Sequence, residues 1–341
     1  MSPELRRLDL RALPKVQLHC HLEGTVRPET FRALAAKYGV DLGERGVPDR
    51  TYAFATFGEF LLLFAKVCET LRAPDDYARV AADYAADAAA QGVRYAEVFI
   101  SPSVWTYFHR SLDVRATVAA IRAALDDAAG IDVALIADVT RNFGAERAEA
   151  TAVQAIALLD LGVIGIGLGG DEARFPAELF ARPFALARDA GLHVVAHAGE
   201  AAGPQSVRAA VQVLGAERIG HGVRAIEDPS VVALVAERRI PLEICPTSNR
   251  LTGAVPPAGP HPLGALDAAG CIVTVDADDP ALFGTSIVDE YAWVARAFGD
   301  DAIQRFAANA IEASFAPPSR KAALRAELAA SRNCPKPERI S

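Results

Sequence analysis

The chain has 341 residues, 51% of them apolar, with no repeated or low-complexity block, so a single domain over residues 1–341 is expected. Its net charge of −8 is dispersed, which argues against a nucleic-acid partner or a membrane surface and favours a small-molecule ligand. The first twenty residues are too charged for a signal peptide, and no later segment is long and apolar enough to span a bilayer. We therefore expect a cytoplasmic protein.

The cysteines agree with a reducing compartment. Their number is odd, and no two of them form a Cys-x-x-Cys pair, so neither a disulfide framework nor a thiolate metal site is indicated. We expect free thiols at all five positions, which are Cys20, Cys68, Cys245, Cys271 and Cys334.

Short apolar or β-branched segments alternate along the chain with longer Ala- and Leu-rich stretches of helical spacing. The short segments predict eight strands, at residues 16–21, 94–100, 132–139, 163–168, 193–197, 218–222, 241–246 and 271–276. Helices are predicted between most of them, over residues 146–162, 176–191, 204–215 and 228–239, and several of these end in Gly, as helices often do. Eight strands that alternate with helices indicate a (β/α)₈ (TIM) barrel.

Two stretches are longer than one crossover between strands requires. Residues 22–93 precede the second strand, and residues 51–71 have a helical pattern, so extra helices are expected to cap the C-terminal face of the barrel. After the eighth strand, residues 289–299 and 320–331 are also predicted to be helical.

Side chains able to do chemistry fall at the C-terminal ends of the predicted strands, where the catalytic groups of such barrels lie. His19 and His21 are two residues apart in the first strand, so both side chains point to the same face. His197 ends the fifth strand, His221 ends the sixth, and Asp278 follows the eighth. Imidazoles and a carboxylate are a donor set that Zn²⁺ favours.

Each of these features alone has an ordinary structural explanation. An isolated His-x-His is as often structural as ligating, and two Asp before Pro are typical of an Asx turn or a helix N-cap. Their joint occurrence at several strand ends favours a metal site. The remaining histidines, His109, His193 and His261, are interpreted as surface or packing residues.

The segments PKVQLHCHLEGTVRPET, GIGLGGDE, HAGE, RIGHG, CPTSN and DADDP follow one another between Pro14 and Pro280. This arrangement resembles the adenosine deaminase branch of the amidohydrolase superfamily. The resemblance implies a zinc-dependent (β/α)₈ barrel that hydrolyses the 6-amino group of an adenine-type ring to a carbonyl and releases ammonia. The fourth predicted strand lacks the Lys that bridges two metals in other members of the superfamily, so one zinc ion is expected.

The resemblance also implies roles for individual residues. Those expected to bind zinc are His19, His21, His197 and Asp278. Glu200 would pass a proton to the ring N1, and His221 would assist the attacking water. Asp279 would meet N7, and the backbone of Gly170 would meet N3. Glu23 stands where members that bind ribose often have Asp, and it would contact the substrate.

The motifs leave several substrates open. Adenosine deaminases often have GIDLAGDE where this chain has GIGLGGDE, whereas adenine deaminases share its HLEG but generally lack GDE. We rank adenosine or a modified adenosine first, 6-aminodeoxyfutalosine second and adenine third. Two other hypotheses are a metal hydrolase for an ester or cyclic amide and a non-catalytic nucleoside-binding protein. The lack of a bridging Lys and the presence of both Glu200 and Asp279 argue against the first, and the retention of Glu200 and of every expected zinc ligand argues against the second.

Overall fold

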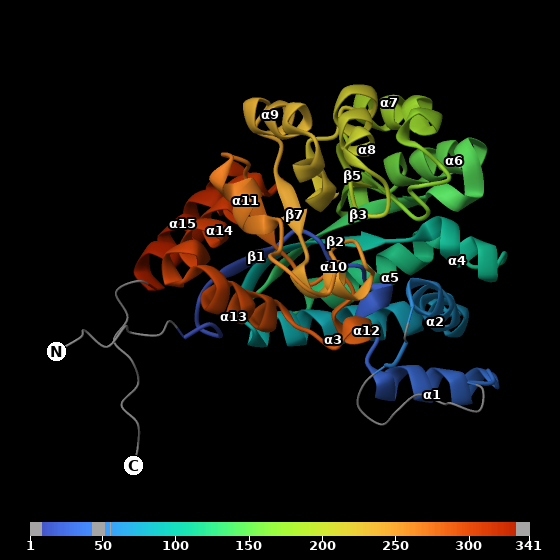
Figure 1. Cartoon of the computed structure of the whole chain (residues 1–341). Helices are drawn as coiled ribbons and strands as arrows, with labels where there is room; N and C mark the ends of the chain where they lie inside the picture. The colour runs from blue at the N-terminus through green and yellow to red at the C-terminus, as the bar shows by residue number, and fades with distance from the viewer. Residues whose placement is uncertain (1–8, 43–51, 55, 332–341) are drawn as a thin grey trace, which may run out of the picture.

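The computed structural model describes residues 9–42, 52–54 and 56–331. Eight parallel strands pair in chain order from β1 to β8, and helices surround them (Figure 1), which confirms the predicted (β/α)₈ barrel. The strands are β1 (Lys15–Gln17), β2 (Val93–Ile100), β3 (Asp132–Thr140), β4 (Val163–Gly169), β5 (His193–Ala198), β6 (Arg218–His221), β7 (Leu242–Ile244) and β8 (Val273–Val275).

The first strand is shorter than the sequence predicts, because it ends at Gln17 rather than at residue 21. The Asp276 carboxylate accepts hydrogen bonds from the backbone N–H groups of Leu18 (2.6 Å) and His19 (3.2 Å), so a side chain takes the place of a strand partner there. Beyond that point Cys20 forms an isolated bridge with Asp278. The barrel therefore closes between β8 and β1 through these contacts.

The helices outside the strands follow the expected alternation. They are α3 (Pro74–Ala90), α5 (Val114–Asp126), α6 (Gly144–Ile156), α7 (Ala181–Asp189), α8 (Pro204–Ala209), α9 (Pro229–Glu237), α11 (Leu263–Ala268) and α14 (Asp300–Ala313). The segment 176–191 divides into a 3₁₀ turn, η4 (Ala177–Phe180), and α7, because Pro183 has no N–H to donate and fits only the first turn of an α-helix. Residues 204–215 contain α8 and a π-helical turn, Ala210–Leu214, that ends at Gly215 in the left-handed conformation.

Extra helices cover the C-terminal ends of the first strands, as expected. Between β1 and β2 the chain forms the 3₁₀ turn η1 (Glu23–Thr25), α1 (Pro28–Tyr38) and α2 (Phe57–Thr70) before α3. Helix α2 packs against η1 and against α4 (Pro102–Phe108), which follow the ends of β1 and β2, and Figure 1 shows α1 and α2 together on that side.

After β8 the chain contains the two predicted helices, α13 (Ile287–Phe298) and α15 (Pro318–Ser331). It also contains α12 (Pro280–Phe283) and α14, which were not predicted, and the short helix α10 (Pro246–Leu251) follows β7. Among the residues that the structure describes, no helix is long and apolar enough to cross a membrane. The cytoplasmic location stays a prediction from the sequence.

A layer of apolar side chains inside the barrel forms the floor of the region where the strands end. Phe99, Ile136 and Val195 are fully buried and contact one another there. The thiols of Cys20, Cys68, Cys245 and Cys271 are buried and free, as predicted, and Cys334 lies outside the described residues.

Candidate metal centre and active site

The four expected metal ligands converge above this floor. Their ligand atoms, on His19, His21, His197 and Asp278, all lie within 4.8 Å of one another. The Nε2 atoms of His21 and His197 are 3.2 Å apart, and Asp278 Oδ1 lies 3.4 Å from His21 Nε2. His19 Nε2 is buried without a hydrogen-bond partner, although it points toward Asp278. Buried donors that face one centre in this way fit a divalent cation such as zinc.

The charges of these groups depend on burial and on their neighbours. Burial, and then the neighbouring imidazoles, lower the pKa of His197 well below its usual value, so its ring is neutral and available as a ligand. Burial alone would raise the pKa of Asp278, but His19, whose Nε2 lies 3.5 Å from Asp278 Oδ1, and the other imidazoles around it hold that pKa well below the usual range. The neutral ring of His197 and the ionised carboxylate of Asp278 are both able to bind a cation. Burial would lower the pKa of His19, but its contacts with Asp278 and Glu243 raise that pKa well above the usual value.

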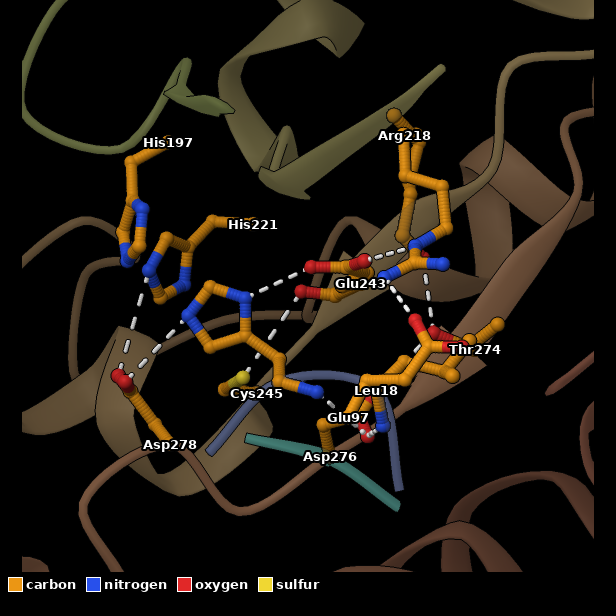
Figure 2. A network of polar contacts seen from close by, with 12 residues as sticks. Leu18, Glu97, His197, Arg218, His221, Glu243, Cys245, Thr274, Asp276 and Asp278 are labelled. Atoms are coloured by element: carbon orange, nitrogen blue, oxygen red, sulfur yellow. Dashed lines mark hydrogen bonds and ion pairs between the residues drawn. The ribbon is translucent and has the colours of Figure 1, made fainter. Parts of the chain in front are cut away.

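A buried polar network holds the side chain of His19 in place. Figure 2 shows Glu243, Arg218 and Glu97, which belong to this network. The Glu243 carboxylate accepts a hydrogen bond from His19 Nδ1 at 2.8 Å, which leaves Nε2 facing the other ligands. Arg218 Nε lies 2.5 Å from the other oxygen of Glu243, and Arg218 Nη2 lies 2.6 Å from Glu97. The orientation of His19 therefore depends on a chain of charges that reaches across the barrel interior.

Two site residues have a backbone conformation that residues other than glycine rarely adopt. His221 and Asp278 both have a φ of 62°, in the left-handed region. Such a conformation costs about 1–3 kcal/mol per residue and persists only where surrounding contacts impose it. Ser248 Oγ donates to Asp278 Oδ2 at 2.6 Å, and Asn249 Nδ2 donates to His221 Nδ1 at 3.0 Å. Helix α10 thus fixes both side chains.

Glu200 and His221 form a second group beside the ligands. Glu200 Oε2 lies 3.5 Å from His221 Nε2, which is in turn 4.0 Å from Asp278 Oδ2. Burial, followed by the charges of Asp278 and Glu172, raises the pKa of Glu200 to about 8. Burial lowers the pKa of His221 to about 3, so this ring is neutral, and the bond from Asn249 places its proton on Nε2. A protonated carboxyl and a neutral imidazole donor thus stand side by side.

Of the adjacent residues Asp278 and Asp279, only Asp278 is ionised. Burial, followed by the charge of Asp278, raises the pKa of Asp279 well above its usual range, while Asp278 stays ionised. Asp279 Oδ1 is buried without a hydrogen-bond partner. A Cβ atom on Gly24 would lie 1.8 Å from that oxygen, so a residue with no side chain is required there. The pair therefore supplies one anionic ligand and one neutral carboxyl.

The two other predicted contacts lie at the same end of the barrel. Glu23 is fully buried in η1, and its Oε1 accepts from Trp105 Nε1 at 2.6 Å and from the backbone N–H of Ser101 at 3.0 Å. Gly170 follows β4 in the left-handed region with a φ of 97° and is exposed. Its nearest side-chain neighbour is Asn142, whose Oδ1 would lie 2.5 Å from a Cβ atom on Gly170.

The sequence analysis assigned no role to Glu172, which holds the loop that carries Glu200. The Glu172 carboxylate is buried and accepts four backbone hydrogen bonds, from Gly199 (2.5 Å), Glu200 (3.1 Å), Ala201 (2.8 Å) and Ala202 (2.9 Å). An anion that accepts several N–H groups fixes a loop strongly. Only its place in GIGLGGDE, before a strand that ends in HAGE, could have suggested this contact.

Glu172→Gln is expected to lower kcat by about 10²-fold without loss of metal, because an amide NH₂ would face backbone donors and displace Glu200. Hydrogen exchange of residues 199–202 should become faster, and zinc content should stay that of the unchanged chain. Glu178→Gln, at an exposed position in η4, is the matched control. Unchanged exchange and kcat in Glu172→Gln would show that the loop does not depend on this carboxylate.

Arg141 is a second positioning residue that the sequence analysis missed. It is fully buried, and its guanidinium donates to the backbone carbonyls of His197 and Phe175, both at 2.7 Å. The bond to His197 joins the end of β5 to the segment that follows β3, across the intervening strand β4. A single Arg after a predicted strand carries no signal of this role, because the contact depends on the fold.

Comparison with known proteins places this geometry in a family. The family model for adenosine deaminase matches residues 14–331. Adenine deaminase from Rhizobium rhizogenes is 39% identical over 320 residues, which cover 93% of this chain and 99% of that protein. Aminodeoxyfutalosine deaminase from Streptomyces coelicolor is 39% identical over 342 residues, covering 96% of this chain and 87% of that protein.

Solved structures agree with these matches. The adenine deaminase from Arthrobacter aurescens superimposes with a TM-score of 0.88 and 33% identity, over 94% of this chain and 100% of that one. An amidohydrolase from Burkhoderia ambifaria with bound zinc gives a TM-score of 0.86 and 29% identity, over 97% of this chain and 95% of that one. With the ligand cluster and its neighbouring acid, these matches show that the chain belongs to the adenosine deaminase family.

Proposed function

We propose that the chain is a zinc-dependent hydrolase that converts the 6-amino group of an adenine-type ring to a carbonyl and releases ammonia. The observation that carries this proposal is the placement of a protonated carboxyl, Glu200, beside a buried cluster of three imidazoles and one carboxylate. The bound zinc of the Burkhoderia ambifaria protein supports the choice of metal. Relatives named adenine deaminase and aminodeoxyfutalosine deaminase support an adenine-type substrate.

The residues that would hold a single zinc ion are His19, His21, His197 and Asp278. When bound, zinc lowers the pKa of a coordinated water from 15.7 to about 7 and so supplies a hydroxide nucleophile at neutral pH. The Nε2–H of His221 lies on the side of the proposed ligand Asp278, and it can orient the attacking oxygen by donating a hydrogen bond. Its low pKa keeps the ring neutral, so it does not repel the cation.

Glu200 has the protonation state that the chemistry requires. Attack at the carbon that bears the amino group moves electron density onto N1, which must receive a proton as the ring loses aromaticity. A carboxyl with a pKa of about 8 holds that proton at neutral pH. The resulting carboxylate can accept the proton of the hydroxyl group that has added to the ring carbon and pass it to the amino group, which then leaves as ammonia while the carbonyl forms.

Asp279 is proposed to bind the ring at N7. Since its raised pKa keeps it neutral, its O–H can donate to N7, which has a lone pair and no proton in the usual tautomers of adenosine and adenine. The backbone N–H of Gly170 is proposed to donate to N3, and a position without a side chain allows that close approach. These contacts would hold the ring with its 6-position toward the metal ligands.

The direct test is ultraviolet detection of deamination by zinc-loaded protein. Adenine, adenosine, 2′-deoxyadenosine, 6-aminodeoxyfutalosine and AMP are compared at equal concentrations. The expected result is turnover of at least one of them, loss of activity after chelation, and recovery when zinc is restored. If a protein that retains bound zinc turns over none of these compounds, the hypothesis of a non-catalytic nucleoside-binding protein replaces this one.

The value of kcat/KM is expected to fall as pH rises through about 8, because only protonated Glu200 can donate to N1. Burial raises its pKa to about 8, so the acid form predominates at pH 7 and is lost above pH 8. A cation beside Asp278 offsets part of that carboxylate's effect and moves the decline toward lower pH. Steady-state rates between pH 6 and pH 10 measure this limb, and a constant kcat/KM up to pH 10 would contradict the assignment.

A further inference from the structure

Asp138 is a buried acid near the C-terminal end of the barrel. The proposed deamination steps give it no role. It lies on β3 two residues beyond Ile136, which belongs to the apolar floor, so its side chain points to the same inner face. His197 likewise lies two residues beyond Val195 on β5, so its side chain also points to the inner face. Asp138 therefore lies above the floor on the side where the proposed ligands converge.

The Asp138 carboxyl occupies space that neighbouring glycines leave open, but its buried Oδ1 has no hydrogen-bond partner. The residue is 6% exposed. A Cβ atom on Gly167 or on Gly169 would lie 2.7 Å from one of its two oxygens, so the glycines of β4 leave the space that the carboxyl occupies. An unpaired buried polar group is costly and indicates a partner that the chain itself does not provide.

A second unpartnered oxygen lies in the same region. Glu23 is fully buried, and while its Oε1 is held by Trp105 and Ser101, its Oε2 has no hydrogen-bond partner. The charge of Glu23 is one reason, after burial, why the pKa of Asp138 is raised to about 8. Both the neutral and the ionised form of a carboxyl present an oxygen that can accept a hydrogen bond.

The order of the strands indicates which edge of the ring Asp138 meets. On the contacts proposed above, Glu200 after β5 meets N1, Gly170 after β4 meets N3, and Asp279 after β8 meets N7. Around a purine the ring nitrogens follow one another as N1, N3, N9 and N7. Strand β3 pairs with β4 on one side and with β2 on the other, so Asp138 comes next after N3. That position corresponds to N9.

We propose that Asp138 accepts a hydrogen bond from N9–H and thereby selects a free 6-aminopurine base over substrates that carry a sugar on N9. This inference rests on the proposed function and narrows its substrate class. A free base has a donor at N9, whereas a nucleoside has a carbon there, which would leave Asp138 unpaired and bring the sugar against it. The order of substrates expected from the motifs is then reversed, with adenine first.

The first test uses the unchanged, zinc-loaded protein with adenine, 9-methyladenine and adenosine. We expect kcat/KM for adenine to exceed both others by about 10³-fold or more, because a site built around a substrate N–H rejects analogues that lack it. Comparable values for adenine and 9-methyladenine would overturn the inference and leave the proposed deaminase intact. Calorimetric binding of hypoxanthine and 9-methylhypoxanthine gives the same comparison without turnover, so a failure of the proposed chemistry is distinguished from a failure of this inference.

Variants then test the residue itself. Asp138→Ala removes the acceptor and opens space, so we expect kcat/KM for adenine to fall by about 10²-fold and the preference for adenine over 9-methyladenine to shrink by at least as much. Asp132→Ala, at the exposed start of the same strand, is the matched control and should leave that ratio unchanged. An unchanged preference in Asp138→Ala protein with normal zinc content would overturn the role of Asp138.

Discussion

Glu200→Gln will retain zinc and lose kcat by about 10²- to 10⁴-fold, the range that general acid catalysis by a positioned side chain contributes. The amide has nearly the same shape as the carboxyl, and Glu200 is not among the four proposed ligands. Glutamine can still donate a hydrogen bond but cannot transfer a proton to N1. Binding of substrate should therefore change far less than the rate.

The measurement combines elemental analysis for zinc with steady-state rates and the pH profile. The decline of kcat/KM above about pH 8 should disappear in the variant, because the group that titrates is gone. Glu237→Gln, at an exposed position at the end of α9, is the control for the same change of charge. Retention of most of the activity by a zinc-loaded Glu200→Gln protein would refute the role of Glu200.

The barrel and the ligand cluster were predictable because both depend on regular patterns. Alternation of short apolar segments with helical stretches indicates eight strand and helix pairs, and the strand ends then place His19, His197 and Asp278 at one face of the barrel. These side chains converge although β1 is shorter than expected, because the isolated bridge between His21 and Phe99 keeps the chain extended after Gln17, and their role as metal ligands stays a prediction.

The residues that hold the proposed ligands and the loop of Glu200 in place could not be predicted in this way. Glu172 and Glu243 act through partners that are distant in sequence, as in the bond between Glu243 and His19. A carboxylate in a strand or a loop has the same local pattern whether it faces solvent or fixes a loop. Only the register of the strands decides between these outcomes, and register depends on the whole sheet.

The role of Asp138 was hidden for a different reason. Periodicity places it on the inner face of β3, where barrel interiors are filled mainly by apolar side chains, but the pattern does not say whether a partner is available. The glycines of β4, Gly167 and Gly169, provide the space for its carboxyl, whereas in the sequence Gly169 next to Gly170 indicates only a close approach of the backbone to a ligand or a tight turn. The proposed preference for a free base therefore depends on Asp138 in β3 together with the space that Gly167 and Gly169 leave in β4.

Arg218→Met will destabilise the fold and weaken zinc binding together. Arg218 is buried, pairs with Glu243 and Glu97, and lies 3.8 Å above the ring of Phe315. Burial would raise the pKa of Glu243, but the charges of Arg218 and His19 keep it lowered. Removing the cation leaves two buried carboxylates uncompensated, which costs about 3–5 kcal/mol in the free energy of unfolding.

The effect on the metal follows from the same contacts. Without Arg218, Glu243 is no longer held against His19 Nδ1, so the dissociation constant for zinc should rise by about 10- to 100-fold, the usual result of losing such support. Denaturant unfolding and competition with a chelator measure the two effects. Arg305→Met, which breaks a more exposed pair with Asp267, should change stability by less than about 1 kcal/mol. If Arg218→Met behaves like this control in both measurements, the network does not orient His19, and the ligands alone determine the affinity of the centre.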